Sequence, residues 1–212
     1  MGAIELSVLA LFVPTFFFVS VTPGMCMTLA LTMGMTLGVR RTLWMMAGEL
    51  TGVALVAVSA VLGIAALMLQ YPGAFQVFKY CGGVYLAWLG IQMWRARGRM
   101  AMAAPEARDP TAPLPSRWAL AAQGFVTAVA NPKGWAFFIA LLPPFINDNQ
   151  PLAPQLAVLI AIILLLESLC LLIYAGGGRT LSRLLAQGES VRLVNRIAGT
   201  LMLGVGAWLA FG

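Results

Sequence analysis

Long apolar stretches constrain this chain more than any other feature, because each is close to the length that crosses a lipid bilayer. A helix of about 20 apolar residues spans the hydrocarbon core of a membrane. Six stretches near that length follow one another along the sequence, at residues 4–33, 43–69, 74–94, 118–142, 153–175 and 192–211. They predict an all-α integral membrane protein with six transmembrane helices.

The composition supports this prediction and excludes other classes of protein. Hydrophobic side chains make up 61% of the 212 residues and charged side chains only 9%, whereas about 25% of the residues in soluble domains are charged. A chain of this length has too little interior to hide so much apolar surface from water. A lipid bilayer is therefore the expected cover, and a soluble enzyme, a nucleic-acid-binding protein and a disordered chain are excluded despite the net charge of +6.

Missing residue types narrow the chemistry further. The sequence contains no His, which excludes imidazole metal ligands and nucleophiles activated by histidine. The three cysteines, Cys26, Cys81 and Cys170, lie far apart in apolar runs and form no CxxC pair, so neither a zinc site nor a disulfide framework is indicated. No GxSxG or HExxH motif is present. We expect neither an enzyme nor a metal or cofactor site.

The arginines predict how the chain is oriented in the membrane. Loops rich in Lys and Arg lie on the cytoplasmic side of membrane proteins. All the arginines of this chain lie in or beside alternate loops, at Arg40, Arg41, Arg95, Arg97, Arg99, Arg108, Arg117, Arg179, Arg183, Arg192 and Arg196. The other loops, residues 71–73 and 143–154, carry one charge, that of Asp148. We therefore expect the arginine-bearing loops in the cytoplasm and both termini outside.

A proline-dotted segment divides the chain into two parts. Pro105, Pro110, Pro113 and Pro115 interrupt the sequence between the third and fourth apolar stretches. This division predicts three units, which are a first three-helix repeat at residues 1–95, a cytoplasmic linker at 96–117 and a second three-helix repeat at 118–212.

The two repeats share landmarks in the same order. Residues 16–23 (FFFVSVTP) match residues 125–132 (FVTAVANP), and Glu49 in the second stretch corresponds to Glu167 in the fifth. Because each repeat has three spans, the second enters the membrane from the opposite face, so the repeats are inverted. Inverted repeats are typical of secondary transporters, which hold their substrate near the middle of the membrane where the repeats meet.

Two proline motifs lie inside the first and fourth stretches instead of at their ends. They are Thr22-Pro23-Gly24 and Asn131-Pro132-Lys133. Thr and Asn are good helix N-caps, and Pro is favoured at the first helical position. Each motif therefore predicts that one helix stops and another starts within the membrane, and such a start attracts an anion such as a carboxylate. The alternative interpretation is an ordinary proline kink.

Glu49 and Glu167 are the acidic residues well inside the predicted spans. A charge in the middle of a bilayer costs on the order of 2.5–3.5 kcal/mol by insertion scales, so it usually faces a cavity or a partner. Three roles remain open and do not exclude one another. These carboxyl groups could pair with Lys133 or Lys79, bind the ammonium group of a substrate, or take and release a coupling proton.

These features resemble the LysE/RhtB family of amino-acid exporters. The resemblance rests on the six spans, the Thr-Pro-Gly break at residues 22–24, the Asn-Pro-Lys break at 131–133, the acid early in the second span and the sequence GGVYLAWLG at 82–90. It runs over nearly the whole chain. The chain departs from the family pattern at Met25, where Pro is frequent, and at Gly134, where Ala is frequent.

The resemblance implies a bacterial inner-membrane protein that expels amino acids or close derivatives, with the proton gradient as the expected driving force. Both termini would then lie in the periplasm. Carried over residue by residue, the family's motifs fall on Thr22, Pro23, Gly24, Glu49, Asn131, Pro132 and Lys133. The acid in the second span is commonly Asp in the family, and the longer Glu49 leaves the identity of the substrate open.

We expect a proton antiporter that exports a small neutral zwitterionic amino acid or derivative by alternating access. The substrate carboxylate would lie at the helix starts after Pro23 and Pro132, near Lys133, and its ammonium group would face Glu49 or Glu167, one of which exchanges the proton. The expected partners are the amino acid, protons and the bilayer, without nucleic acid, and a homo-oligomer is compatible with the sequence. The alternatives are an ion transporter or channel on the same frame, an exporter of basic amino acids, and a membrane assembly factor.

Overall fold

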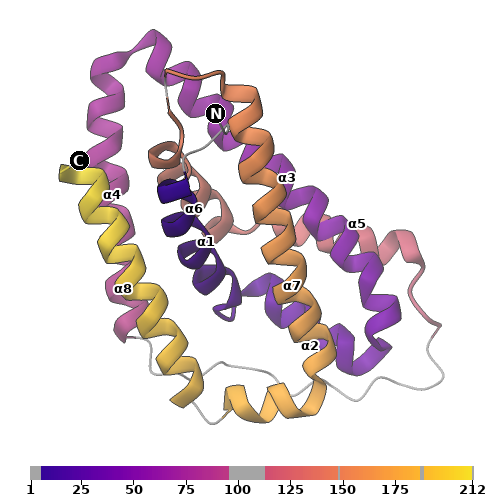
Figure 1. Ribbon diagram of the computed structural model, residues 1–212. Coiled ribbons are helices and arrows are strands. Elements are labelled where there is room, and N and C mark those ends of the chain that lie inside the picture. The colour runs from indigo at the N-terminus through magenta and orange to yellow at the C-terminus, as the bar shows by residue number, and fades with distance from the viewer. Residues whose placement is uncertain (1–5, 96–112, 148, 187–188, 212) are drawn as a thin grey trace.

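The computed structural model describes residues 6–95, 113–147, 149–186 and 189–211, and this part of the chain folds into helices without a strand (Figure 1). The helices are α1 (Leu6–Val21), α2 (Met25–Leu37), α3 (Val39–Gln70), α4 (Pro72–Arg95), α5 (Arg117–Val129), α6 (Pro132–Leu141), the short 3-10 helix η1 (Pro143–Phe145), α7 (Leu152–Ala186) and α8 (Glu189–Phe211). The all-α prediction is therefore confirmed. The predicted linker lies outside the described residues up to residue 112, and residues 113–116 lead into α5.

Three segments are long and apolar enough to cross a membrane among the described residues. Two are single helices, Val39–Gly63 within α3 and Leu152–Gly178 within α7. The third is a bent pair, in which Val8–Val21 and Met25–Leu37 meet at an angle of 56°. Helices also occupy the other predicted spans, as α4, α5 with α6, and α8. The number of six spans remains a prediction.

Both proline motifs lie between helices. Helix α1 ends at Val21 and α2 begins at Met25, so residues 22–24 form the bend. In the same way α5 ends at Val129 and α6 begins at Pro132. Proline suits this first position because the first N–H groups of a helix have no partner within the helix, so the missing one is not needed.

Glycines let α3 and α5 lie against each other. A methyl group added at Gly48 of α3 would collide with the carbonyl oxygen of Ala121, and one added at Gly124 of α5 would collide with the carbonyl oxygen of Met45. Small residues are the usual means of close helix contact in membranes. Because Gly48 precedes Glu49, this contact also fixes the height of the acidic side chain relative to α5.

Helices α4 and α8 pack against each other in an antiparallel arrangement through a second set of glycines (Figure 1). A methyl group at Gly90 would lie 2.7 Å from the carbonyl oxygen of Gly199, and one at Gly199 would lie 2.6 Å from that of Gly90. Two helical turns further along α8, a methyl group added at Gly206 would likewise lie close to the carbonyl oxygen of Gly83. These two helices are the third of each predicted repeat, and their contact is reciprocal.

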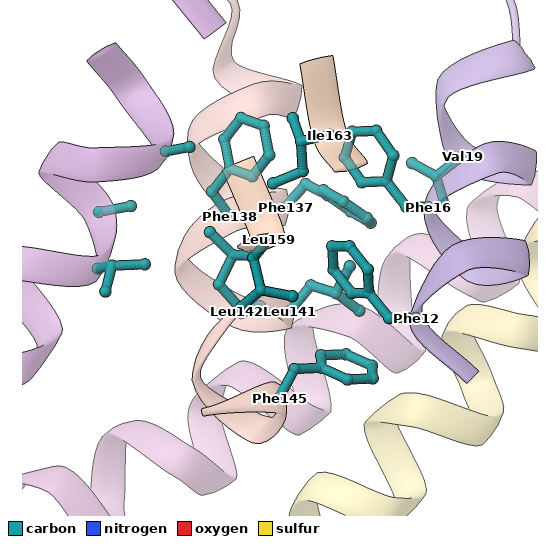
Figure 2. Close-up of a cluster of buried hydrophobic side chains, with 14 of the residues drawn as sticks. Phe12, Phe16, Val19, Phe137, Phe138, Leu141, Leu142, Phe145, Leu159 and Ile163 are labelled. Atoms are coloured by element: carbon teal, nitrogen blue, oxygen red, sulfur yellow. The ribbon is translucent and has the colours of Figure 1, made fainter. Parts of the chain in front are cut away.

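An aromatic cluster forms the core between α1, α6 and α7. Phe12 and Phe16 of α1 pack against Phe137 and Phe138 of α6 and Phe145 of η1, all of them buried (Figure 2). Ring pairs in such offset and edge-on arrangements contribute about 0.5–1.5 kcal/mol each beyond the area that they bury. The cluster joins α1, the helix before the first proline motif, to α6, the helix that begins at the second.

Candidate functional site

A cavity of about 70 Å³ lies where the two helix breaks meet α3 and α7. Six of the eight predicted site residues line it, namely Thr22, Gly24, Glu49, Asn131, Lys133 and Glu167. They come from both predicted repeats and from segments more than 100 residues apart. Pro23 and Pro132 are not among the lining residues, so their contribution is to the backbone of the two breaks.

Asn131 builds the start of α6. Its side-chain oxygen accepts a hydrogen bond of 3.1 Å from the backbone N–H of Lys133, which is the N-cap geometry that the sequence indicates. Its side-chain nitrogen lies 3.7 Å from the sulfur of Cys26 on α2 and donates to it. Asn131 therefore caps its own helix and at the same time contacts the start of the other helix that follows a break.

The other break has no side-chain cap. Gly24 precedes α2 in an extended conformation, and its carbonyl oxygen accepts the first helical hydrogen bond, 2.9 Å from Thr28 N–H. The hydroxyl of Thr22 donates back to the carbonyl of Phe18 at 2.7 Å and so belongs to the last turn of α1. Gly24 has no side chain with which to cap the first N–H groups of α2, and this helix start lies at the wall of the cavity.

Lys133 connects the two breaks. Its ammonium group donates to the carbonyl oxygens of Val19, at 3.1 Å, and Thr22, at 3.5 Å. The last carbonyls of a helix have no partner within the helix, and a cation is favourable at this end. Lys133 on α6 therefore satisfies the end of α1, and one of its three N–H donors remains for another group in the cavity.

The two acidic side chains have different surroundings. Glu49 is 0% exposed, and neither of its carboxyl oxygens has a hydrogen-bond partner in the described part of the chain. Glu167 accepts a hydrogen bond of 2.5 Å from the hydroxyl of Ser20 on α1. Both line the cavity and are close enough to interact electrostatically. Lys133 bonds to backbone carbonyls instead of pairing with either, and the side chain of Lys79 lies outside the described ones.

Apolar side chains form the rest of the cavity wall. They come from α1, α3 and α6 and include Phe16, Val19, Val53, Val56, Phe137 and Phe138. Phe16, Phe137 and Phe138 belong at once to this wall and to the aromatic cluster (Figure 2). The cavity therefore offers a cation, an unpaired carboxyl group and a hydrophobic surface within one small volume.

Sequence reasoning missed three polar groups at this site. Ser20 bonds Glu167, Cys26 lines the cavity, and the hydroxyl of Tyr174 donates to the carbonyl of Val21 at 2.8 Å. Tyr174 follows Glu167 by seven residues, which places both on one face of α7. That spacing was a usable signal for Tyr174. Ser20 and Cys26 stand in apolar runs and gave none.

The sequence profile described as "LysE type translocator" matches residues 17–212, which include every residue of the cavity wall except Phe16. The chain belongs to the LysE type translocator family. The family resemblance drawn from the two proline motifs is thereby confirmed, and with it the interpretation as a membrane transport protein.

Curated relatives of this LysE type translocator match it over most of its length. An uncharacterized membrane protein of Vibrio cholerae is 30% identical over 191 residues, 90% of each chain. A homoserine/homoserine lactone efflux protein of Salmonella typhimurium is 29% identical over 191 residues, again 90% of each chain. A leucine efflux protein of Enterobacter is 28% identical over 198 residues, 92% of this chain and 90% of its own. No solved structure matches the chain.

Proposed function

We propose that this protein exports a small amino acid or amino-acid derivative across the bacterial inner membrane in exchange for protons. The observation that carries the proposal is the cavity that joins the unpaired carboxyl group of Glu49 to the ammonium group of Lys133. A zwitterion presents opposite charges a few bonds apart, and this pair of groups is complementary to it. The efflux of homoserine, homoserine lactone and leucine, named for relatives, supports the same substrate class.

In the proposed complex, the substrate carboxylate lies against the start of α2 and the ammonium group of Lys133, and not against the start of α6 as the sequence predicted. The start of α2 after Gly24 and the ammonium group of Lys133 both lie at the cavity wall. The first N–H groups of α6 already bond Asn131, whose side chain accepts from Lys133 and whose carbonyl accepts from Gly134. Backbone N–H groups at a helix start bind anions without any further cation. The apolar wall then receives the substrate side chain.

The ammonium group of the substrate and the coupling proton would share Glu49. The Ser20 hydroxyl already bonds one oxygen of Glu167, whereas neither oxygen of Glu49 accepts a hydrogen bond from the described residues. A buried carboxylate without a partner is costly, and either a proton or an ammonium group removes that cost. Because the two cannot occupy the same oxygen together, their competition at Glu49 couples export to proton entry. Glu167 contributes a second carboxyl group to the site and is held in place by the Ser20 hydroxyl of α1.

Alternating access would come from movement of the inverted repeats, residues 1–95 and 118–212, about the cavity. In the proposed arrangement six spans place both termini in the periplasm and the arginines in the cytoplasm. The start of α1 and the end of α6 then lie on the periplasmic side. Three rings of the aromatic cluster, Phe16, Phe137 and Phe138, line the cavity, and the cluster would close the periplasmic path in this conformation.

Transport by the purified protein in proteoliposomes tests the proposal. Vesicles preloaded with unlabelled leucine or homoserine should accumulate the labelled amino acid in exchange, and the Glu49→Gln variant should lose at least 90% of this activity while it inserts normally. Glu189→Gln, the same change at the exposed start of α8, serves as the matched control and should keep full activity. A panel of toxic amino acids and analogues in overexpressing cells would define the substrate.

A second candidate, an exporter of basic amino acids or an ion transporter, is favoured by the charge count in the cavity. Two carboxyl groups face a single lysine there. Cation flux that needs no amino acid, together with no amino-acid exchange by the wild type, would support this candidate and overturn the first. Exchange of arginine or lysine but of no neutral amino acid would limit the substrate to basic amino acids.

A further inference from the structure

A second hollow, of about 510 Å³, lies at the starts of α3 and α5, and it shares no residue with the transport cavity. Arg40 and Arg41, from the first turn of α3, line it together with Arg117, the first residue of α5. The proposed transport mechanism does not use these side chains. Positive-inside topology accounts for arginines in a loop, but it does not require three of them to gather around one hollow.

Among the described residues that line this hollow, no acidic side chain balances the positive charge. The first turns of α3 and α5 contain no acidic residue. Arg117 lies with its guanidinium carbon 5.3 Å from the centre of the Trp44 ring, a cation–π contact that orients it without neutralising it. Arg40 is exposed and Arg41 is half-buried. Three guanidinium groups around one volume form a site for an oxyanion, because each presents a fork of N–H donors.

The apolar rim of the hollow shows which anion it suits. Trp44 and Leu114 line the hollow and are 43% and 52% exposed. Tryptophan and leucine side chains beside arginines are typical of the level where lipid headgroups meet acyl chains. A free phosphate ion would use the arginines alone, whereas a phospholipid would use the arginines and the apolar rim together.

We propose that this hollow binds the phosphate headgroup of an anionic phospholipid, held by Arg40, Arg41 and Arg117, with the lipid glycerol and acyl chains along Trp44 and Leu114. Basic pockets between membrane helices recognise anionic headgroups in this manner. The bound lipid would join the starts of α3 and α5, the two helices that the contact of Gly48 with Ala121 packs together. The site is independent of the proposed transport function.

Binding of dioleoyl phosphatidylglycerol to the detergent-purified full-length protein tests this site. Native mass spectrometry counts the bound lipid, and the melting temperature from tryptophan fluorescence reports its effect. Wild type should bind phosphatidylglycerol and melt at a higher temperature, and dioleoyl phosphatidylcholine should have little effect. Arg40→Gln with Arg117→Gln should raise the apparent Kd for phosphatidylglycerol roughly 30-fold, from about 1 kcal/mol for each arginine lost.

Two control variants distinguish a specific lipid site from a general effect of the protein's positive charge. Arg95→Gln with Arg192→Gln removes the same charge from exposed arginines away from the hollow and should keep the wild-type affinity. Arg40→Lys with Arg117→Lys keeps the charge but loses the forked donors, so its affinity should be intermediate. Equal losses in the two glutamine variants would overturn the proposal. So would equal stabilisation by phosphatidylcholine, or by inorganic phosphate alone, which would indicate a phosphate site instead of a lipid site.

Discussion

The ammonium group of Lys133 on α6 donates a 3.1 Å hydrogen bond to the carbonyl oxygen of Val19 near the end of α1. The two residues are 114 positions apart, one in each predicted repeat. This bond connects the two helix breaks, so a movement that separates them must break it. It also gives Lys133 a structural partner in addition to the anion that we propose it attracts.

Replacing Lys133 by Met should therefore have two effects. Export should fall below 10% of wild type because the substrate carboxylate loses its cation. The protein should also lose roughly 1.5–3 kcal/mol of stability, because the carbonyls of Val19 and Thr22 lose a charged donor. Transport in proteoliposomes and the melting temperature in detergent measure the two effects separately.

Lys133→Arg is the matched control, because it keeps a donor within reach of the same carbonyls. It should recover most of the stability and only part of the export. Full export by the methionine variant, at equal abundance in the membrane, would contradict the role of Lys133 in substrate binding.

The competition proposed at Glu49 predicts a particular pH dependence. A proton on this carboxyl group excludes the substrate ammonium group, so the KM for export should rise as the pH on the substrate side falls. The rise can reach about tenfold per pH unit, the limit for a single competing proton. In Glu49→Gln any residual transport should have a KM that does not change with pH. The measurement is the initial rate in everted vesicles over a pH series.

Glu189→Gln controls for a general effect of losing an acidic side chain, because Glu189 starts α8 outside the cavity. It should keep the wild-type pH profile. If Glu49→Gln kept that profile too, the coupling proton would have to be assigned elsewhere, with Glu167 as the next candidate.

Ser20 should matter through Glu167. Its hydroxyl donates the 2.5 Å bond that fixes one carboxyl oxygen, so Ser20→Ala leaves that oxygen without its partner. Bonds to charged groups contribute roughly 1.5–3 kcal/mol. We expect a lower melting temperature and a shift in the pH profile of export. A purely structural loss would lower the melting temperature but would not shift the pH profile. Ser59→Ala, at an exposed position of α3, should change neither.

The sequence predicted the residues of the candidate site better than the contacts between them. Spacing and residue type matched Thr22 with Asn131 and Glu49 with Glu167 in the two repeats, and all four line the cavity. The contacts of Lys133 with Val19 and of Ser20 with Glu167 join residues more than 100 positions apart. Helical periodicity tells which face a residue occupies, but not which other helix that face meets, so these pairs could not be predicted.

The same limit applies to the fold. Gly48 and Gly52 flank Glu49, and α3 lies close against α5 at both glycines. The sequence did not predict that α5 is the helix packed against α3 there, because Gly124 lies in an ordinary apolar run.

Gly124→Ala should disturb the α3–α5 contact directly. Its added methyl group would collide with the carbonyl oxygen of Met45 and approach the backbone nitrogen of Glu49. Overpacking of this kind costs about 1–3 kcal/mol, and here it also displaces the acidic side chain. Melting temperature and export should both fall. Gly63→Ala is the matched control, because nothing lies within 4 Å of its added methyl group, and Ala is the better helix former.

The aromatic cluster should limit access to the cavity from the periplasmic side. Cys26 lines the cavity and is 6% exposed, so it is a native reporter for a thiol reagent. In a Cys81→Ser, Cys170→Ser background, a membrane-impermeant maleimide added outside spheroplasts should label Cys26 slowly. Phe16→Ala removes a ring that lines the cavity and stacks on Phe138, and it should raise the labelling rate at least tenfold.

Leu62→Ala controls for a general loosening of the helices, because Leu62 of α3 is 53% exposed and outside the cluster. It should leave the labelling rate unchanged. Excess substrate should slow the labelling in Phe16→Ala, since substrate and reagent then compete for the same space beside Glu49. Fast labelling of Cys26 from outside in the wild type would mean that the aromatic cluster does not close this path, and the periplasmic gate would have to be sought in another layer of side chains.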